Sequence, residues 1–212
     1  MEDKLCADYV NILKEELLPA MGCTEPIAVA YAAALAKSTL GRIPEKVEIT
    51  VSGNILKNVK SVIVPCTGGL KGVASAAAAG IISGRAEDKL EVLAHLDDED
   101  RKAIKDYMKK ADISVRQSDS GCIFDIGVKL TSANEEAYAR IEGHHTNVVE
   151  LSRNGQKLIS REILKENADE GFTDRSVLSV RGIIEFANTV ELDRIDGVIS
   201  RQIEYNTAIA EE

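Results

Sequence analysis

The sequence predicts an α+β fold, a single domain over residues 1–212 in which an antiparallel mixed sheet packs against alanine-rich helices. Two observations support this class. Apolar residues recur with a helical period in the first and last parts of the chain, and with a period of two between about residues 113 and 161. Runs of helix and runs of strand, rather than their strict alternation, are typical of α+β proteins.

The first part of the chain divides into two helices and two short strands. An apolar face over 3–18 predicts a helix that Pro19 ends, and a second helix is expected over 24–39. The alternation in "KVEITV" predicts a half-buried strand, which the small polar residues 52–54 break. "SVIV" is then expected to form another short strand before Pro65.

The remainder begins with the glycine-rich turn "CTGGLKG", which leads into an alanine-rich helix. An amphipathic helix is expected over 97–110, because acids crowd its first turn and lysines its last. Helices return over 174–188 and from residue 196 onward. Consecutive strands, the last two joined by an Asn-Gly hairpin turn, are expected at 113–117, 122–130, 135–142, 146–152 and 156–161.

The composition excludes several classes of protein. With 44% hydrophobic and 29% charged residues, the chain resembles an ordinary globular protein. A net charge of -9 argues against binding to nucleic acid or to an anionic membrane surface. The start lacks the features of a signal peptide, and the longest apolar run is too short to cross a bilayer, so a cytoplasmic location is expected.

The four cysteines are expected to be free thiols, because they lie far apart and form no C-x-x-C pair. They also lack the spacing of a self-contained zinc or iron–sulfur site. The four cysteines are Cys6, Cys23, Cys66 and Cys122.

Cys23 is the most informative of them, because "MGCTEP" places it just before a predicted helix. Thr24 is the expected N-cap, Glu25 suits the first turn, and Pro26 is tolerated there. The positive end of the helix dipole would stabilise a thiolate, which makes Cys23 a candidate nucleophile or general base. The alternative is a small buried residue that fills a tight turn.

Three further stretches carry polar groups that could bind a ligand. Residues 52–54 end a strand, and the backbone N–H groups of 66–69 could cradle a carboxylate or a phosphate. Residues 142–147 contain two adjacent histidines, which in a strand would point to opposite faces, so at most one would face a site. His95, next to an acidic helix start, is expected to be a surface or capping residue. Turns and caps alone also explain such residues, and a histidine pair without further ligands is weak support for a metal.

Taken together, four stretches carry a resemblance to a known family. "GCTEPIAVAYAAA", "VSGNILKN", "PCTGGLKGVASAAAAG" and "EGHHTNVV" resemble, in this order, the N-terminal half of the L-cysteine desulfidase family, which is similar to the iron–sulfur L-serine dehydratases. The resemblance covers essentially the whole chain, and members of that family are about twice as long. It implies cleavage of L-cysteine to sulfide, ammonia and pyruvate without pyridoxal phosphate (PLP).

The resemblance also implies a cofactor and a partner. Family members hold a four-iron four-sulfur (4Fe–4S) cluster with three cysteines of their C-terminal half, which has no counterpart in this sequence. The chain is therefore expected to bind no metal itself and to be inactive alone. It would be an N-terminal domain or a split-gene subunit whose partner is the C-terminal half, and it could also form a homo-oligomer. Such a domain is expected to expose an apolar face.

Site residues follow from the same resemblance. Cys23 corresponds to the proton acceptor of the family, Thr67 and Gly68 would offer donors to the substrate carboxylate, and the "HTN" residues would contact the substrate or orient the base. The substrate-binding residues implied in this way are Thr24, Glu25, Asn54, Thr67, Gly68, His145, Thr146 and Asn147. The alternatives are an L-serine dehydratase half, a non-catalytic amino-acid-binding domain, and an assembly module.

Overall fold

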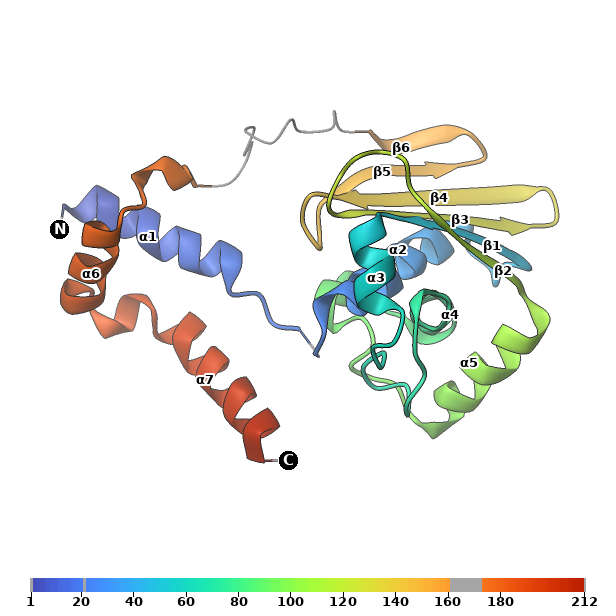
Figure 1. Cartoon of the computed structure of the whole chain (residues 1–212), viewed down its shortest axis with the longest axis horizontal. Helices are drawn as coiled ribbons and strands as arrows, with labels where there is room; N and C mark the ends of the chain where they lie inside the picture. Colours follow the sequence, from blue (N-terminus) through green and yellow to red (C-terminus); the bar gives the residue numbers. More distant parts are fainter. Residues whose placement is uncertain (1, 21, 161–172, 212) are drawn as a thin grey trace. The chain divides into compact units, whose positions relative to one another are not determined.

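The computed structural model describes residues 2–20, 22–160 and 173–211, and the chain separates into two compact units (Figure 1). One unit is Ala20–Ile163, and the other combines Met1–Pro19 with Leu164–Glu212. The single domain expected over residues 1–212 stays a prediction. The predicted α+β class, with a mixed and mainly antiparallel sheet, is confirmed.

The larger unit is built on a six-stranded sheet with the order β2-β1-β3-β4-β5-β6. The β1–β2 pair is parallel, and every other pair is antiparallel. Asn154 and Gly155 both have positive φ and form the predicted tight turn between the last two strands. The strands are β1 (Lys46–Val51), β2 (Asp112–Gln117), β3 (Asp125–Ser132), β4 (Glu135–Glu142), β5 (Val148–Arg153) and β6 (Gln156–Ser160).

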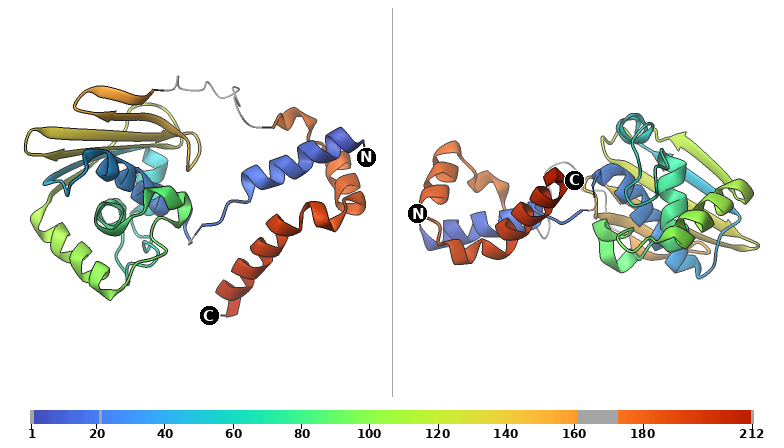
Figure 2. Two further views of the ribbon diagram at one scale, coloured as in Figure 1. Left: turned by 180° about the vertical axis from the view of Figure 1, so that it is seen from behind. Right: turned by 90° about the horizontal axis from the view of Figure 1, so that it is seen from below.

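The helices of this unit gather on one face of the sheet, as Figures 1 and 2 show. The central helix is buried almost all round, which explains why its sequence is apolar on every side. Small residues allow this helix to approach its neighbour α4 (Val73–Ser83) closely. A Cβ added to Gly80 of α4 would lie 2.0 Å from the carbonyl oxygen of Ala30 in the central helix. The helices are α2 (Thr24–Leu40), which is the central one, α3 (Gly53–Val59), α4 (Val73–Ser83), η1 (Ala86–Glu91) and α5 (Asp98–Lys110).

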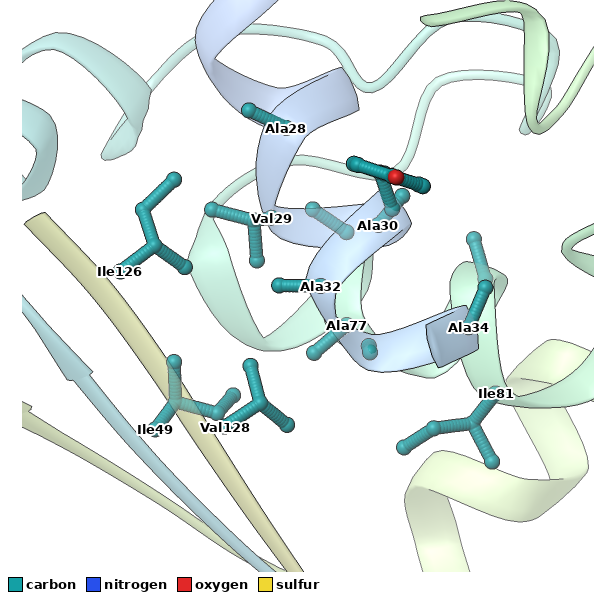
Figure 3. Packing of buried hydrophobic residues seen from close by; sticks show 14 of the residues in the cluster. Ala28, Val29, Ala30, Ala32, Ala34, Ile49, Ala77, Ile81, Ile126 and Val128 are labelled. Carbon is teal, nitrogen blue, oxygen red and sulfur yellow. The ribbon is translucent and has the colours of Figure 1, made fainter. Parts of the chain in front are cut away.

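Branched residues of the sheet meet the small residues of the helices in the core (Figure 3). Ile49 of β1 and both Ile126 and Val128 of β3 lie in one cluster with Val29 and Ala32 of α2. With only 4% aromatic residues in the chain, aliphatic side chains fill this core, and its packing depends on the short distance between α2 and α4.

The second unit is helical. Tyr9 stacks against Phe186 with ring centroids 5.2 Å apart, and its hydroxyl donates to the carbonyl of Val177. Glu15 pairs with Arg175, which ties the first helix to the segment before the sixth. The elements are α1 (Asp3–Glu16), η2 (Arg175–Val177), α6 (Val180–Thr189), η3 (Leu192–Arg194) and α7 (Asp196–Glu211).

Helix α6 is apolar on two faces. Gly182 and Phe186 point inward, whereas Val180, Ile183 and Ile184 are 76%, 50% and 57% exposed. Together with the exposed Ala187 they occupy positions i, i+3, i+4 and i+7 of one helical stripe. The expectation of an exposed apolar face is thus met within this unit.

Several predicted elements differ in the structure. "SVIV" is not a strand, because among the described residues it forms a single bridge, between Ile63 and Lys71 across the glycine turn that follows it. The residues expected only to break the first strand instead begin α3, since the Ser52 hydroxyl accepts from the amide of Ile55 and caps it. The short helix η1 was not predicted.

Strand and helix boundaries also shift. The strand expected at 122–130 begins at Asp125, and the strand expected at 146–152 begins at Val148. The helix expected from residue 174 begins at Val180, after the η2 turn. Residue 161 lies outside the described residues. Within the described ranges, no helix combines the length and the apolar character needed to cross a membrane.

Candidate functional site

The sequence motifs converge at one end of the sheet. Val51 at the end of β1 pairs with Gln117 at the end of β2, and also with Ile126 near the start of β3. Asp125 at the start of β3 faces Glu142 at the end of β4. The segments that continue from these residues, namely α3, the loop 118–124 and the turn 143–147, therefore meet at this end.

Backbone hydrogen bonds fix these segments to one another. The Ser52 amide donates to the carbonyl of Asp125, and its hydroxyl donates to the carbonyl of Ile123 at 2.6 Å. The Gly143 amide donates to the carbonyl of Phe124. The "SGN" and "HHTN" motifs are thus held against the same loop, although 90 residues separate them in sequence.

The "GCTEP" turn brings Cys23 to the start of α2. Cys23 is exposed and is itself the N-cap residue, so the predicted cap at Thr24 is wrong by one position. Gly22 has a φ of +135°, and a Cβ there would lie 3.1 Å from Cγ of Pro65. The close approach of two motif turns, "GCTEP" and "PCTGG", therefore requires glycine at position 22.

A hydrogen-bonded group surrounds the Cys23 thiol. Its Sγ donates to Oε2 of Glu25 at 3.2 Å. Nδ2 of Asn58, on α3, donates to Oε1 of the same carboxylate at 3.4 Å. Asn58 was not among the predicted residues, although its spacing of four from Asn54 in "SGNILKN" places both on one helical face.

The electrostatics of this pair correct the expectation of a thiolate. Partial burial raises the pKa of Cys23, and the hydrogen bond to Glu25 and its negative charge raise it further, against a smaller lowering by the Glu25 amide. Partial burial acts to raise the pKa of Glu25 too, but the Cys23 thiol, its own amide, Asn58 and the charge of His145 together lower it. A Cys23 pKa above its ordinary value, with partial burial as the largest cause, and a Glu25 pKa below its ordinary value make the pair a thiol beside a carboxylate at neutral pH.

His145 is the predicted histidine that acts on this group. Its ring lies against Phe124, with centroids 4.6 Å apart. Burial lowers the pKa of His145, and the charge of Glu25 opposes that effect. Both histidines lie in a turn rather than in a strand, so the expectation that they point to opposite faces does not apply.

The same turn contains Thr146 and Asn147. The Asn147 side chain donates to the carbonyl of Glu142 at 2.8 Å, and its amide donates to the carbonyl of His144. Asn147 therefore holds the shape of the turn that carries His145.

Hydrogen bonds from two side chains hold the "PCTGG" loop in its conformation. Thr67 is fully buried, and its hydroxyl donates to the carbonyl of Val64 at 2.7 Å, so this side chain is committed to the loop. Nε of Arg101 donates to the carbonyl of Cys66 at 2.9 Å, a contact that sequence reasoning did not find. Gly68 is exposed with a φ of +68°, and Asn54 is exposed in the first turn of α3.

A second thiol–carboxylate pair lies at the same end of the sheet. The Cys122 thiol donates to Glu142 at 3.0 Å, and Nη2 of Arg140 lies 2.7 Å from the same carboxylate. Arg140 also pairs with Asp125 at 2.8 Å, and Asp125 accepts from Ser118 and Ser120. Arg140 is thus the ion-pair partner of both buried carboxylates. In the sequence, only the alternation in β4 indicates that Arg140 and Glu142 lie on the same face of the sheet.

A metal centre does not fit the described residues. Within the ranges 2–20, 22–160 and 173–211, no group of three or more His, Cys, Asp or Glu side chains could hold a metal ion. The thiol of Cys122 donates to Glu142, and Cys6 accepts from Arg194 in the helical unit. The residues present therefore do not match the ligand set of an iron–sulfur cluster.

Comparison with known proteins identifies relatives without a named activity. The chain is 46% identical over 209 residues to a UPF0597 protein of Desulfitobacterium hafniense, covering 99% of the chain and 48% of that protein. It is 41% identical to a UPF0597 protein of Treponema denticola and 39% identical to one of Lachnoclostridium phytofermentans, over 96% of the chain in both cases and 47% and 48% of those proteins. The chain thus spans about half the length of these relatives. No family model and no solved structure matches it.

Proposed function

We propose that this relative of the UPF0597 proteins is the base-bearing part of a PLP-independent iron–sulfur lyase, which eliminates hydrogen sulfide and ammonia from L-cysteine to give pyruvate. The observation that carries the proposal is the exposed Cys23 thiol at the start of α2, 3.2 Å from Glu25 and within the group that Asn58 and His145 complete. In this proposal the enzyme is cytoplasmic, and Cys23 accepts the proton.

β-Elimination from an amino acid requires a base that removes the proton alpha to the carboxylate. A cysteine thiolate suits this role when it is exposed at the mouth of a site. Because Cys23 rests as a thiol, it must first lose its own proton and can then take the substrate proton on Sγ. Glu25, which accepts a hydrogen bond from the thiol, and Asn58, which donates to Glu25, are proposed to control this loss of the thiol proton.

The remaining predicted residues take supporting roles in the proposal. Gly68 is exposed in the "PCTGG" loop, which approaches the thiol-bearing turn. Asn54 is exposed on α3, the helix that carries Asn58. Both residues are assigned to substrate binding. Thr146 shares the turn of His145 and is assigned with it. Thr24 begins α2, and Thr67 and Asn147 are assigned to shaping the loops that the substrate would meet.

The cluster belongs to another part of the protein in this proposal, because the described residues do not fit it. The chain spans about half of its relatives, and the missing half is the proposed partner.

The stripe on α6 is the proposed docking surface for that half. Three of its branched side chains are at least half exposed and share one helical stripe, and a contiguous exposed apolar patch is typical of an interaction site. Their spacing matches the pattern by which a helix lies in an apolar groove. A second copy of the chain is the competing occupant.

The test uses the polypeptide of full family length, prepared anaerobically with iron and sulfide. Wild type, Cys23→Ala and the thiol control Cys122→Ala are offered L-cysteine and L-serine in parallel, with sulfide, ammonia and pyruvate as readouts. Product from wild type and from Cys122→Ala, but not from Cys23→Ala, supports the proposal. Equal sulfide from all three removes Cys23 from the mechanism.

Two other outcomes select the alternatives. Pyruvate from L-serine without sulfide from L-cysteine would identify an L-serine dehydratase. If neither substrate reacts, binding of both amino acids to the chain, unchanged in Cys23→Ala, would identify a non-catalytic binding domain. Oligomers without any amino-acid binding would identify an assembly module.

A further inference from the structure

The two thiol–carboxylate pairs of the larger unit differ in one respect. The Glu142 carboxylate accepts a hydrogen bond from the Cys122 thiol and also forms an ion pair with the Arg140 guanidinium. Glu25 receives the Cys23 thiol and an amide of Asn58, but within the described part of the chain no lysine or arginine lies within ion-pair distance of it. Glu25 is thus the carboxylate of the two that lacks a strong cationic partner.

We propose that the Glu25 carboxylate holds Cys23 as a thiol in the unliganded protein, and that the α-ammonium group of an amino-acid ligand pairs with Glu25 and thereby frees Cys23 to ionise. This inference rests on the proposed function, because it assigns the ligand group that reaches the same site. It gives Glu25 the role of a positioning residue that acts through Cys23.

The geometry explains how one carboxylate serves both states. Asn58 holds Oε1, which leaves Oε2 turned to the thiol. A cation at Glu25 would compete for Oε2 and neutralise the charge that disfavours a thiolate. When the thiol then ionises, its proton leaves to solvent, the S–H bond breaks, and the electron pair stays on sulfur, ready to accept a proton from the ligand.

Among the described residues, three charged or titratable side chains act on the pair or on each other. Glu25 acts on Cys23, His145 acts on Glu25 from the β4–β5 turn, and His144 acts on His145. The positive end of α2 opposes a cation, so binding of the ammonium group depends on the Glu25 charge. Replacement of that charge should therefore abolish the effect of the ligand and also release the thiol in its absence.

The experiment is an ultraviolet titration of the Cys23 thiolate in the 212-residue chain, with the spectrum of Cys23→Ser subtracted to remove the other thiols. L-Alanine is the probe, because it has the α-ammonium and carboxylate groups but no leaving group. Propionate, which lacks the ammonium group, is the matched ligand. We expect L-alanine to move the titration midpoint to lower pH, and propionate to leave it unchanged.

Variants separate the switch from a general effect on folding. Glu25→Gln should titrate at lower pH than wild type without any ligand and should not respond to L-alanine. Asn58→Ala should respond weakly, whereas Lys57→Ala, at an exposed neighbouring position on α3, should behave as wild type. Circular dichroism checks that each variant is folded.

Three results would overturn the inference: no shift of the midpoint at any concentration of L-alanine, the same shift with propionate, or a Glu25→Gln midpoint equal to that of wild type. None of these readouts depends on lyase activity. If L-alanine shifts the Cys23 titration but the protein forms no product from L-cysteine or L-serine, the role of Glu25 is supported and the lyase activity is overturned. If the protein forms product but L-alanine does not shift the titration, the lyase activity is supported and the role of Glu25 is overturned.

Discussion

Asn58 donates to the carboxylate of Glu25 across 33 residues of sequence, and this contact joins α3 to the first turn of α2. Its length of 3.4 Å and its exposure indicate that it contributes little to stability. Its importance is geometric, since it leaves one carboxylate oxygen for the Cys23 thiol.

Asn58→Ala should change the titration of Glu25 more than the stability of the protein. Loss of the Asn58 donor removes one of the hydrogen bonds that lower the pKa of Glu25, so that pKa should rise toward its usual value. The free energy of unfolding should fall by less than about 0.5 kcal/mol, as for other surface substitutions. Carbon-detected nuclear magnetic resonance of the Glu25 carboxyl group measures the first effect, and urea denaturation the second. An unchanged Glu25 titration would show that the contact is not formed in solution.

Thr67→Val tests whether this residue shapes the loop or binds the substrate. The buried hydroxyl donates to the Val64 carbonyl, so its loss should cost about 1–3 kcal/mol in unfolding free energy. Thr67→Ser keeps the donor and should retain most of the stability. If Thr67→Val instead kept full stability and weakened only substrate binding, the hydroxyl would face the substrate.

Arg140→Met should strongly destabilise the larger unit. Asp125 and Glu142 are 3% and 6% exposed, and removal of Arg140 leaves two buried carboxylates without their cation. Breaking a buried ion pair in this way costs about 3–5 kcal/mol. Arg153→Ala, which breaks the exposed pair with Glu135, should cost less than about 1 kcal/mol and is the matched control.

The cost of Arg140→Met should also depend on pH. Burial acts to raise the pKa of Asp125, but Arg140, Ser118 and Ser120 lower it below its usual value. A lowered folded-state pKa stabilises the protein above the unfolded pKa, and this contribution is lost as the pH falls through the folded pKa. The difference between wild type and Arg140→Met should therefore narrow in acid. A difference that stays constant from pH 7 to pH 3 would contradict the assignment of an ionised Asp125.

Gly80→Ala should separate α2 from α4. The added methyl group would meet the backbone of Ala30 at 2.0 Å, and backbone cannot move aside as a side chain can. Overpacking of this kind costs about 1–3 kcal/mol or more. Gly197→Ala in α7, where a Cβ meets nothing within 4 Å, should be neutral or stabilising by up to about 1 kcal/mol. Thermal denaturation of both variants provides the comparison.

Sequence reasoning found the elements that local signals specify. Alternating apolar residues located β1 to β6, the Asn154-Gly155 turn specified a hairpin, and the acids at 97–100 located the start of α5. It missed α3, because the cap at Ser52 resembles an ordinary strand break. It also extended the strands at 122 and 146 into loops whose shape depends on tertiary hydrogen bonds, such as those of Ser52 to Ile123 and of Gly143 to Phe124.

The proximity of the candidate site residues could be predicted only in part, for the same reason. The motifs named Cys23, Glu25 and His145 as site residues, and the structure brings these three together. The direction of the pKa shift of Cys23 could not follow from its place in sequence, because the helix dipole and the Glu25 charge act in opposite directions. Only the side-chain geometry shows that the carboxylate is turned toward the thiol. Phe124 and Arg101 carry no local signal, and nothing local indicates the contact of Asn58 with Glu25, since the partners are distant in sequence.

If the α6 stripe is the proposed docking surface for the complementary half, Ile183→Glu should weaken that association while leaving the helical unit folded. Ile183 is 50% exposed in the α6 stripe, so a charge there meets solvent in the isolated chain and should change unfolding free energy by less than about 0.5 kcal/mol. At an interface the same charge would be buried without a partner, which is costly. Size-exclusion chromatography of the two halves expressed together measures the loss of the complex, with Arg181→Ala, an exposed residue outside the stripe, as control. If Ile183→Glu instead abolished self-association of the chain and left binding of the complementary half intact, the stripe would be an interface between two copies.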